Sequence, residues 1–171
     1  MYTEWLVPIL YYLGSLRINE WISEVIIPFT AALLVTSSYH SIDKTQIALD
    51  ALSEMLPSVV SLLLGFTVLF ATQISDKDTE SVRMLKQIER KVGDRKLSEF
   101  QITNLHITES FYCEIALLLV IFLYLFLKGF NLSVWVECVF LVAYVFFTLH
   151  ILFGIVRFIT KFYFYHLINE K

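Results

Sequence analysis

Residues 57–75 read PSVVSLLLGFTVLFATQIS and contain no charged side chain. An α-helix of about 20 residues crosses the apolar core of a lipid bilayer, and this stretch is close to that length. Three further apolar stretches of similar length lie at residues 21–39, 111–127 and 134–155. The sequence therefore predicts an all-α polytopic membrane protein with four transmembrane helices.

The composition of the whole chain agrees with this prediction. Hydrophobic residues make up 57% of the 171 residues and charged residues 17%, whereas an average globular domain has about 45–50% and about 25%. These values exclude an ordinary soluble domain, and the many aliphatic and aromatic residues exclude a disordered chain. A net charge of -3 gives no general attraction to nucleic acid. We expect residues 1–171 to form a single membrane domain.

The N-terminal part carries a shorter apolar patch, from Trp5 to Leu16, which contains Pro8. This patch is too short to cross a bilayer, so residues 1–19 are predicted to form an interfacial helix. The chain starts without a basic segment, and no small-residue cleavage motif follows. We therefore expect no cleavable signal peptide.

The connection at residues 40–56 is predicted to be a short amphipathic helix on the outer surface, before the second span begins at Pro57. At 100° per residue its apolar and acidic side chains lie on different faces, with Ile42, Leu49, Leu52 and Leu56 on one and Asp43, Asp50 and Glu54 on the other.

Basic residues are concentrated in one connection between spans. Residues 76–110 hold seven of the 13 Lys and Arg residues, whereas residues 40–56 hold only Lys44. Because short cytoplasmic loops carry an excess of Lys and Arg, we expect 76–110 to be a cytoplasmic helical segment. The tail at 157–171 and the N-terminus then lie on the same side. The predicted location is the bacterial inner membrane, with both termini cytoplasmic.

The second span carries a stripe of small and hydroxylated residues. At 100° per residue, one face of the helix collects Ser58, Ser61, Gly65 and Thr72. If the helix continued unbroken from Pro57 to Val92, the same face would carry three basic residues beyond the membrane, Arg83, Lys86 and Arg90.

Two interpretations of this pattern stay open. Small residues let membrane helices pack closely without a pore, and the basic residues then anchor the helix at the inner surface. Alternatively, the stripe lines the pore of a homo-oligomer, with Val68 and Leu69 as an apolar gate. The basic residues of all subunits would then form stacked rings that bind an anionic ligand.

Several ionisable residues fall inside the predicted spans, where they are costly. Antiparallel pairing of the last two spans predicts a structural hydrogen bond between Glu114 and His150. The same pairing predicts a contact between Arg157 and Glu109. Glu24 and Glu114 each lie near the first turn of a helix, where the helix dipole favours an acid. We expect structural roles first, with His150 as a pH-sensitive element second.

No motif for catalysis or cofactor binding is apparent. His106, Glu109 and Cys113 recur at helical spacing, which would suit a metal ion, but no second set of ligands matches them. We expect no metal and no other cofactor. Cys113 and Cys138 are predicted to lie about 15 Å apart along the helix axes, too far for a disulfide. Without a phosphate-binding, nucleophile-elbow or zinc-protease motif, the chain is predicted to have no catalytic residue and not to be an enzyme.

In format the chain resembles the small membrane effectors of bacterial anti-phage defence, in particular the channel subunit of Hailong-type systems. The resemblance covers the N-terminal apolar patch, the four spans, the small-residue stripe and its basic continuation. It implies an ion channel of several copies, gated by a short single-stranded DNA oligomer that a partner nucleotidyltransferase makes. Membrane depolarisation would then stop growth of the infected cell. The resemblance assigns no role to an individual residue.

The predicted function is a homo-oligomeric ion channel, such as a tetramer, that acts as an effector in the lipid bilayer. A nucleotide or oligonucleotide at the cytoplasmic basic rings would gate it. The alternative is a non-conducting membrane scaffold or immunity-type protein that docks a cytoplasmic partner through residues 76–110. Acidic residues outside favour cations and basic rings inside favour anions, so ion selectivity stays open.

Overall fold

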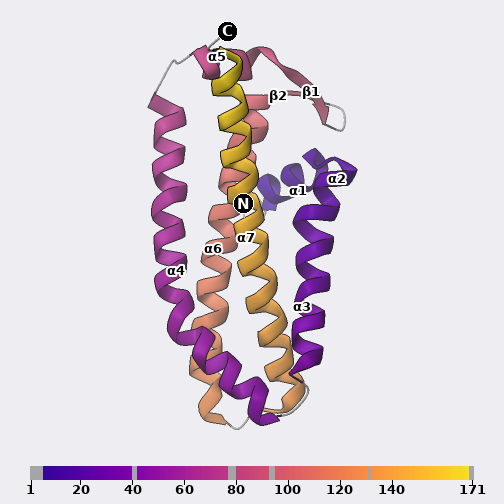
Figure 1. Ribbon diagram of the computed structural model, residues 1–171, viewed down its shortest axis with the longest axis vertical. Coiled ribbons are helices and arrows are strands. Elements are labelled where there is room, and N and C mark those ends of the chain that lie inside the picture. Colours follow the sequence, from indigo (N-terminus) through magenta and orange to yellow (C-terminus); the bar gives the residue numbers. More distant parts are fainter. Residues whose placement is uncertain (1–5, 40–41, 77–79, 93–94, 131, 170–171) are drawn as a thin grey trace.

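The computed structural model describes residues 6–39, 42–76, 80–92, 95–130 and 132–169 (Figure 1). Within these ranges the chain is helical apart from one two-stranded hairpin and a few connecting residues, which confirms the predicted all-α fold class. In chain order the elements are α1 (Leu6–Ser15), α2 (Ile18–Trp21), the π-helix η1 (Ile22–Ile26), α3 (Ile27–Ser38), α4 (Ile42–Asp76), α5 (Glu80–Gln87), β1 (Glu89–Val92), β2 (Arg95–Ser98), α6 (Glu99–Leu127), the 3₁₀ turn η2 (Lys128–Phe130) and α7 (Val134–Asn169).

Among the described residues, four helical stretches are long and apolar enough to cross a membrane: Ile18–Ser38, Lys44–Leu69, Glu99–Phe130 and Val134–Thr160. They run lengthwise side by side in a bundle, with the hairpin and the carboxyl end of α7 at the same end (Figure 1). The four apolar stretches predicted from the sequence therefore all lie in helices that are long and apolar enough to cross a membrane. The largest difference in bounds concerns the second span, which begins earlier than predicted.

Residues 42–56 and the second span belong to one helix, α4, and Pro57 lies inside it. The predicted separate amphipathic helix and the predicted helix start at Pro57 are both wrong. Proline removes one backbone hydrogen bond and bends a helix without always ending it. Figure 1 shows α4 bent in its lower part, so that its first turns run obliquely across the lower end of the bundle.

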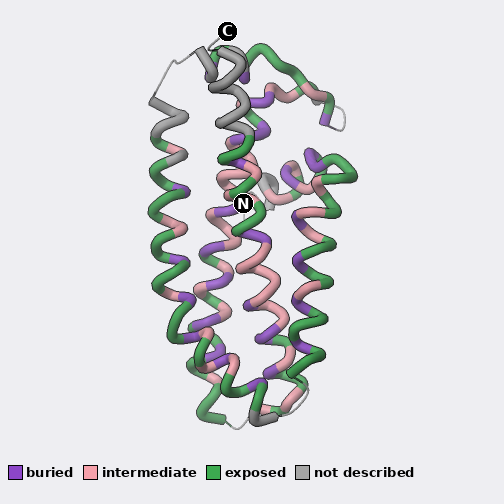
Figure 2. The backbone as a smooth tube through the Cα atoms, in the orientation of Figure 1, coloured by how far each residue is buried: buried purple, intermediate pink, exposed green. Residues whose placement is uncertain are grey.

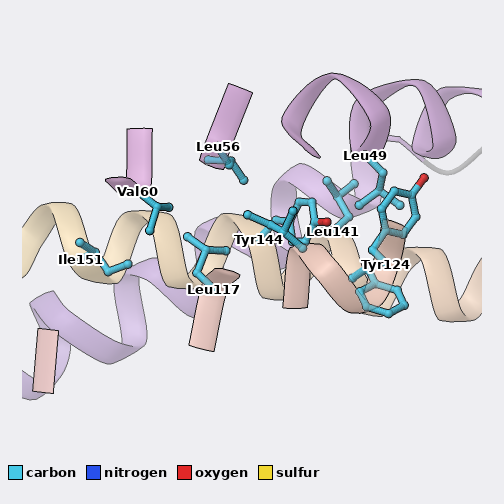
Figure 3. Packing of buried hydrophobic residues seen from close by; sticks show 10 residues of the cluster. Leu49, Leu56, Val60, Leu117, Tyr124, Leu141, Tyr144 and Ile151 are labelled. Carbon is cyan, nitrogen blue, oxygen red and sulfur yellow. The ribbon is translucent and has the colours of Figure 1, made fainter. Parts of the chain in front are cut away.

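The hydrophobic core lies where α4, α6 and α7 meet. Figure 3 shows side chains from all three helices in contact, namely Leu49, Leu56 and Val60 of α4, Leu117 and Tyr124 of α6, and Leu141, Tyr144 and Ile151 of α7. On α4 the buried positions recur every three to four residues, which is the period of a helix with one buried face. The opposite face of α4 is therefore directed away from the core.

The connection between α4 and α6 differs most from the prediction. An unbroken helix from Pro57 to Val92 is wrong, because α4 ends at Asp76 and residues 89–98 form an antiparallel hairpin that pairs Glu89 with Ser98. The sequence signal is Gly93-Asp94, since glycine followed by aspartate is typical of a two-residue hairpin connection. Helical periodicity does not show where a chain leaves the helix axis.

The third membrane-crossing helix begins well before the apolar stretch at residues 111–127, because α6 starts at Glu99. Ser98 is the N-cap of α6: its Oγ accepts a hydrogen bond from the backbone N–H of Gln101 at 3.2 Å. The side chain of Gln101 in turn accepts from the backbone N–H of Ser98 at 2.9 Å. This capping box satisfies two backbone donors that a helix start leaves without partners.

Candidate functional site

The residues predicted to line a pore lie on the exposed face of α4. Figure 2 shows α4 exposed along much of its outer side, with buried positions recurring between. Four of these residues form what we call the α4 stripe, and all four are exposed: Ser58, Ser61, Gly65 and Thr72. The predicted gate residues lie on the same side, where Val68 is 50% and Leu69 is 49% exposed. The whole predicted pore surface is thus available to lipid or to another copy of the chain.

The local chemistry of the α4 stripe suits contact between membrane helices. Ser61 Oγ donates to the carbonyl oxygen of Pro57 at 2.7 Å, and Thr72 Oγ1 donates to that of Leu69 at 2.8 Å. A Cβ added at Gly65 would meet no described atom within 4 Å. Ser61 and Gly65 are four residues apart, the spacing of small residues at which membrane helices approach closely.

The three predicted ligand-binding residues lie on two different elements. Arg83 and Lys86 are exposed on α5, and Lys86 Nζ lies 5.4 Å from the ring centroid of Phe100. Arg90 is on β1, and only 14% of its side chain is exposed. The predicted continuation of the α4 stripe through these residues is therefore wrong, because α4 extends only to Asp76 and Arg90 lies on a strand.

Arg90 takes part in a set of partly buried ion pairs. Its guanidinium lies 3.3 Å from Glu20 Oε2 and 3.8 Å from Glu99 Oε1, and it also donates to the carbonyl oxygen of Ser15. Glu20 pairs in addition with Arg157 of α7, at 2.6 Å. Two arginines distant in sequence thus share one carboxylate.

The same set of contacts continues inward through Glu24 of the π-helix. Arg157 also pairs with Glu24, and Tyr12 OH of α1 donates to Glu24 Oε2 at 2.6 Å. Burial, followed by the charges of Glu109 and Glu24, raises the pKa of Tyr12 above its ordinary value, so the hydroxyl keeps its proton. We call these contacts the inner polar network, which consists of Tyr12, Glu20, Glu24, Arg90, Glu99 and Arg157.

The predicted hydrogen bond between Glu114 and His150 is not formed. His150 Nε2 lies 2.6 Å from Glu109 Oε1, and Glu114 Oε1 accepts from Thr67 Oγ1 at 2.9 Å. The antiparallel register of α6 and α7 places His150 more than one turn beyond Glu114. The predicted contact of Arg157 with Glu109 is wrong for a related reason, since the carboxylates that pair with Arg157 come from the N-terminal part.

A proline explains why His150 reaches the first span. In an α-helix the carbonyl of Glu24 would accept from the N–H of residue 28, but residue 28 is proline and has no N–H. His150 Nδ1 lies 2.5 Å from this carbonyl oxygen. The π-helical turn at residues 22–26 places it there, and such turns are frequent at functional sites.

Sequence reasoning missed the inner polar network, although part of a signal was present. Glu20 and Glu24 are four residues apart and therefore share a helix face. Their arginine partners lie on β1 and α7, and nothing in local spacing predicts these long-range contacts.

No family model, curated protein or solved structure matches this chain. The four long apolar helices indicate a small multi-pass membrane protein. Two structural features bear on a more specific function, namely the exposed face of α4 and the inner polar network.

Proposed function

We propose that the chain is one subunit of a homo-oligomeric ion channel, such as a tetramer, in which α4 faces the pore. The observation that carries the proposal is the α4 stripe, which is small, hydroxylated and exposed on a helix whose other face is buried. Side chains fill the core between α4, α6 and α7 (Figure 3). The ion path would therefore form between copies of the chain and not within one.

The proposed gate lies where apolar side chains interrupt the stripe. Val68 and Leu69 are both about half exposed and lie between Gly65 and Thr72. Brought together around an axis, they would form a narrow apolar ring from which water is easily expelled. A ring of this kind closes a channel by dewetting.

An anionic ligand, such as a nucleotide or oligonucleotide, would bind the exposed Arg83 and Lys86 of α5. Arg90 follows on β1 and pairs with Glu20, which also holds Arg157 of α7. A phosphate that competes with Glu20 for Arg90 would loosen the attachment of the hairpin to the N-terminal helices. Ligand binding at the cytoplasmic end would thereby reach the spans.

The biological setting we propose is an effector of anti-phage defence in the bacterial inner membrane, with both termini cytoplasmic. Its support is the resemblance in format to Hailong-type channel subunits and the excess of basic residues at 76–110. The ligand would then be a short single-stranded DNA made by a partner nucleotidyltransferase.

Single-channel recording of the purified protein in planar bilayers tests the proposal. In a background without the two native cysteines, Ser61→Cys is compared with Leu119→Cys, because Leu119 is 63% exposed on α6. We expect a charged thiol reagent to change the unitary current of Ser61→Cys and to leave that of Leu119→Cys unchanged. Equal effects at both positions would rule out a pore lined by α4.

The same recording separates the channel from a non-conducting scaffold. A scaffold that docks a cytoplasmic partner through residues 76–110 would give no unitary currents at any voltage. The exposure of Arg83 and Lys86 is compatible with such docking. Absence of current together with retained partner binding would therefore favour the scaffold.

A further inference from the structure

Three different ligand-bearing side chains meet where α6 contacts α7. Glu109 Oε1 lies 2.6 Å from His150 Nε2 and 2.8 Å from Cys113 Sγ. The three atoms that could bind a metal all lie within 4.8 Å of one another. Glu109 and His150 are buried and Cys113 is half-buried. An oxygen, a nitrogen and a sulfur ligand thus converge on one small volume inside the bundle.

The hydrogen bonds show which protons this cluster holds. The backbone carbonyl of Glu24 can only accept, so the proton in its contact with His150 belongs to Nδ1. A further proton must lie between His150 Nε2 and Glu109 Oε1. The thiol of Cys113 donates to the same carboxylate oxygen. Two protons therefore occupy the space between the three ligand atoms.

We propose that Glu109, Cys113 and His150 form a binding site for one divalent transition-metal ion, with Zn²⁺ as the best match. Carboxylate, thiolate and imidazole are the ligand types that zinc uses, at distances of about 2.0–2.3 Å. Ligand atoms around tetrahedral zinc are therefore about 3.4 Å apart. This separation lies between the 2.6 Å contact of Glu109 with His150 and the 4.8 Å limit of the cluster. A water molecule would complete the coordination.

Binding would exchange the metal ion for the two protons without changing the charge of the cluster. Before metal binding, the thiol of Cys113 is neutral. His150 and Glu109 are either both charged, with opposite signs, or both neutral. The net charge of the cluster is zero in either case. With the metal, a thiolate, a neutral imidazole and a carboxylate balance the two positive charges. The two protons leave to the solvent. Electroneutral exchange avoids placing an uncompensated charge among the spans, where it is costly.

The residues around His150 hold its imidazole ring in the way that the neighbours of a metal-bound histidine do. A metal-bound histidine almost always donates its other N–H to a carbonyl or carboxylate, which fixes the ring. The contact of Nδ1 with the Glu24 carbonyl provides this and leaves Nε2 for the metal. Phe146 stacks on the imidazole at 5.6 Å, and the edge of Tyr12 faces it at 6.3 Å. Aromatic rings thus hold the imidazole and shield it from water.

The sequence alone does not predict this site, because His150 comes from a different helix, 41 residues after Glu109. The sequence pattern of His106, Glu109 and Cys113 includes two of the three proposed ligands and lacks His150. The proposal does not depend on the chain being a channel, since it concerns binding alone.

Cobalt binding to the purified, reduced full chain in detergent tests the proposal. A thiolate bound to Co²⁺ gives an intense ultraviolet charge-transfer band, which reports sulfur ligation directly. We expect one Co²⁺ per chain with this band, displaced by Zn²⁺. The matched variants are Cys113→Ser and Cys138→Ser, because both cysteines are half-buried and only the first lies in the cluster. The band should persist in Cys138→Ser and disappear in Cys113→Ser.

A second measurement on the unmodified chain avoids any folding defect of the variants. Zn²⁺ should slow the alkylation of Cys113 by a small maleimide at least tenfold and leave that of Cys138 unchanged, as measured by mass spectrometry. A chain that shows no charge-transfer band with Co²⁺ would overturn the proposal. Loss of the band in Cys138→Ser, or its persistence in Cys113→Ser, would do the same.

Discussion

Arg157 of α7 and Glu20 of α2 form an ion pair across the molecule, with Nη2 2.6 Å from Oε1. The two side chains are 17% and 18% exposed. Arg90 of β1 approaches the same carboxylate. Glu20 is therefore the point at which the hairpin and the last helix are both attached to the N-terminal segment.

Removing the charge of Arg157 should destabilise the protein strongly. In Arg157→Gln the carboxylates of Glu20 and Glu24 lose a cation that is largely buried with them. Loss of one partner of a buried ion pair costs about 3 kcal/mol. Thermal unfolding in detergent, followed by circular dichroism, measures the change.

Lys128→Gln is the matched control for this variant. Lys128 Nζ pairs with Asp50 at 3.3 Å, but the two side chains are 43% and 41% exposed. An exposed ion pair contributes about 1 kcal/mol or less. Equal losses of stability in Arg157→Gln and Lys128→Gln would show that burial does not strengthen the contacts of Arg157.

The hydroxyl of Tyr12 is expected to contribute to stability through Glu24. Tyr12→Phe removes the donor to Glu24 Oε2 and keeps the ring, so we expect a loss of about 2 kcal/mol. Tyr39→Phe serves as control, because Tyr39 is 38% exposed, and it should change the stability little. Chemical unfolding of both variants checks this.

The contribution of Tyr12 should also depend on pH in one direction. The pKa of Tyr12 is raised in the folded state, mainly by burial. A raised pKa means that the stabilisation is complete below the unfolded value of about 10 and decreases as the pH rises above it. The stability difference between the wild type and Tyr12→Phe should therefore be constant from about pH 7 to pH 9 and shrink above about pH 10. A difference that grows there would contradict the assigned contact.

Bulk on the outer face of α4 should disturb assembly but not the fold of the subunit. Gly65→Leu adds a side chain where no described atom lies within 4 Å of the new Cβ, so the subunit has room for it. The proposed contact between copies has no room for this side chain, so the oligomer should dissociate. Size-exclusion chromatography with light scattering measures the mass. Thr30→Leu on the exposed face of α3 is the control and should leave the mass unchanged.

A larger side chain at Gly154 of α7, unlike one at Gly65, should destabilise the fold of the subunit. A Cβ at Gly154 would lie 3.2 Å from Ser110 Oγ of α6, closer than most such contacts. Gly154→Leu should therefore force α6 and α7 apart and lower the unfolding temperature by several degrees, as overpacking costs about 1–3 kcal/mol. Thermal unfolding of Gly154→Leu and Gly65→Leu side by side provides the comparison.

Charge reversal at the hairpin end should separate ligand binding from folding. Arg83→Glu with Lys86→Glu changes two exposed side chains of α5 and should alter the ligand response in bilayer recordings, with insertion intact. Arg90→Glu should instead destabilise the protein, because the largely buried side chain of Arg90 pairs with Glu20 and Glu99. If the double reversal leaves the response to an oligonucleotide unchanged, α5 is not the ligand site.

Local features of the sequence predicted the spans and account for the start of α6. Apolar length predicts each crossing helix, and the Ser98–Gln101 capping box depends on residues three apart. Periodicity failed where the chain leaves a helix axis, since the residues after Asp76 fit the helical period of the stripe and nevertheless include the hairpin. It also failed at Pro57, where helix continuation depends on packing against α6 and α7.

An all-α chain with four helices able to cross a membrane can be predicted from the amino-acid sequence, because apolar length and composition are local properties. The cluster of His150, Glu109 and Cys113 and the contacts of Arg157 with Glu20 and Glu24 are visible only in the tertiary structure. These contacts depend on the register between α6 and α7 and on the placement of α2 beside the hairpin. The packing of large side chains across several helices sets that register, and no short stretch of sequence contains it.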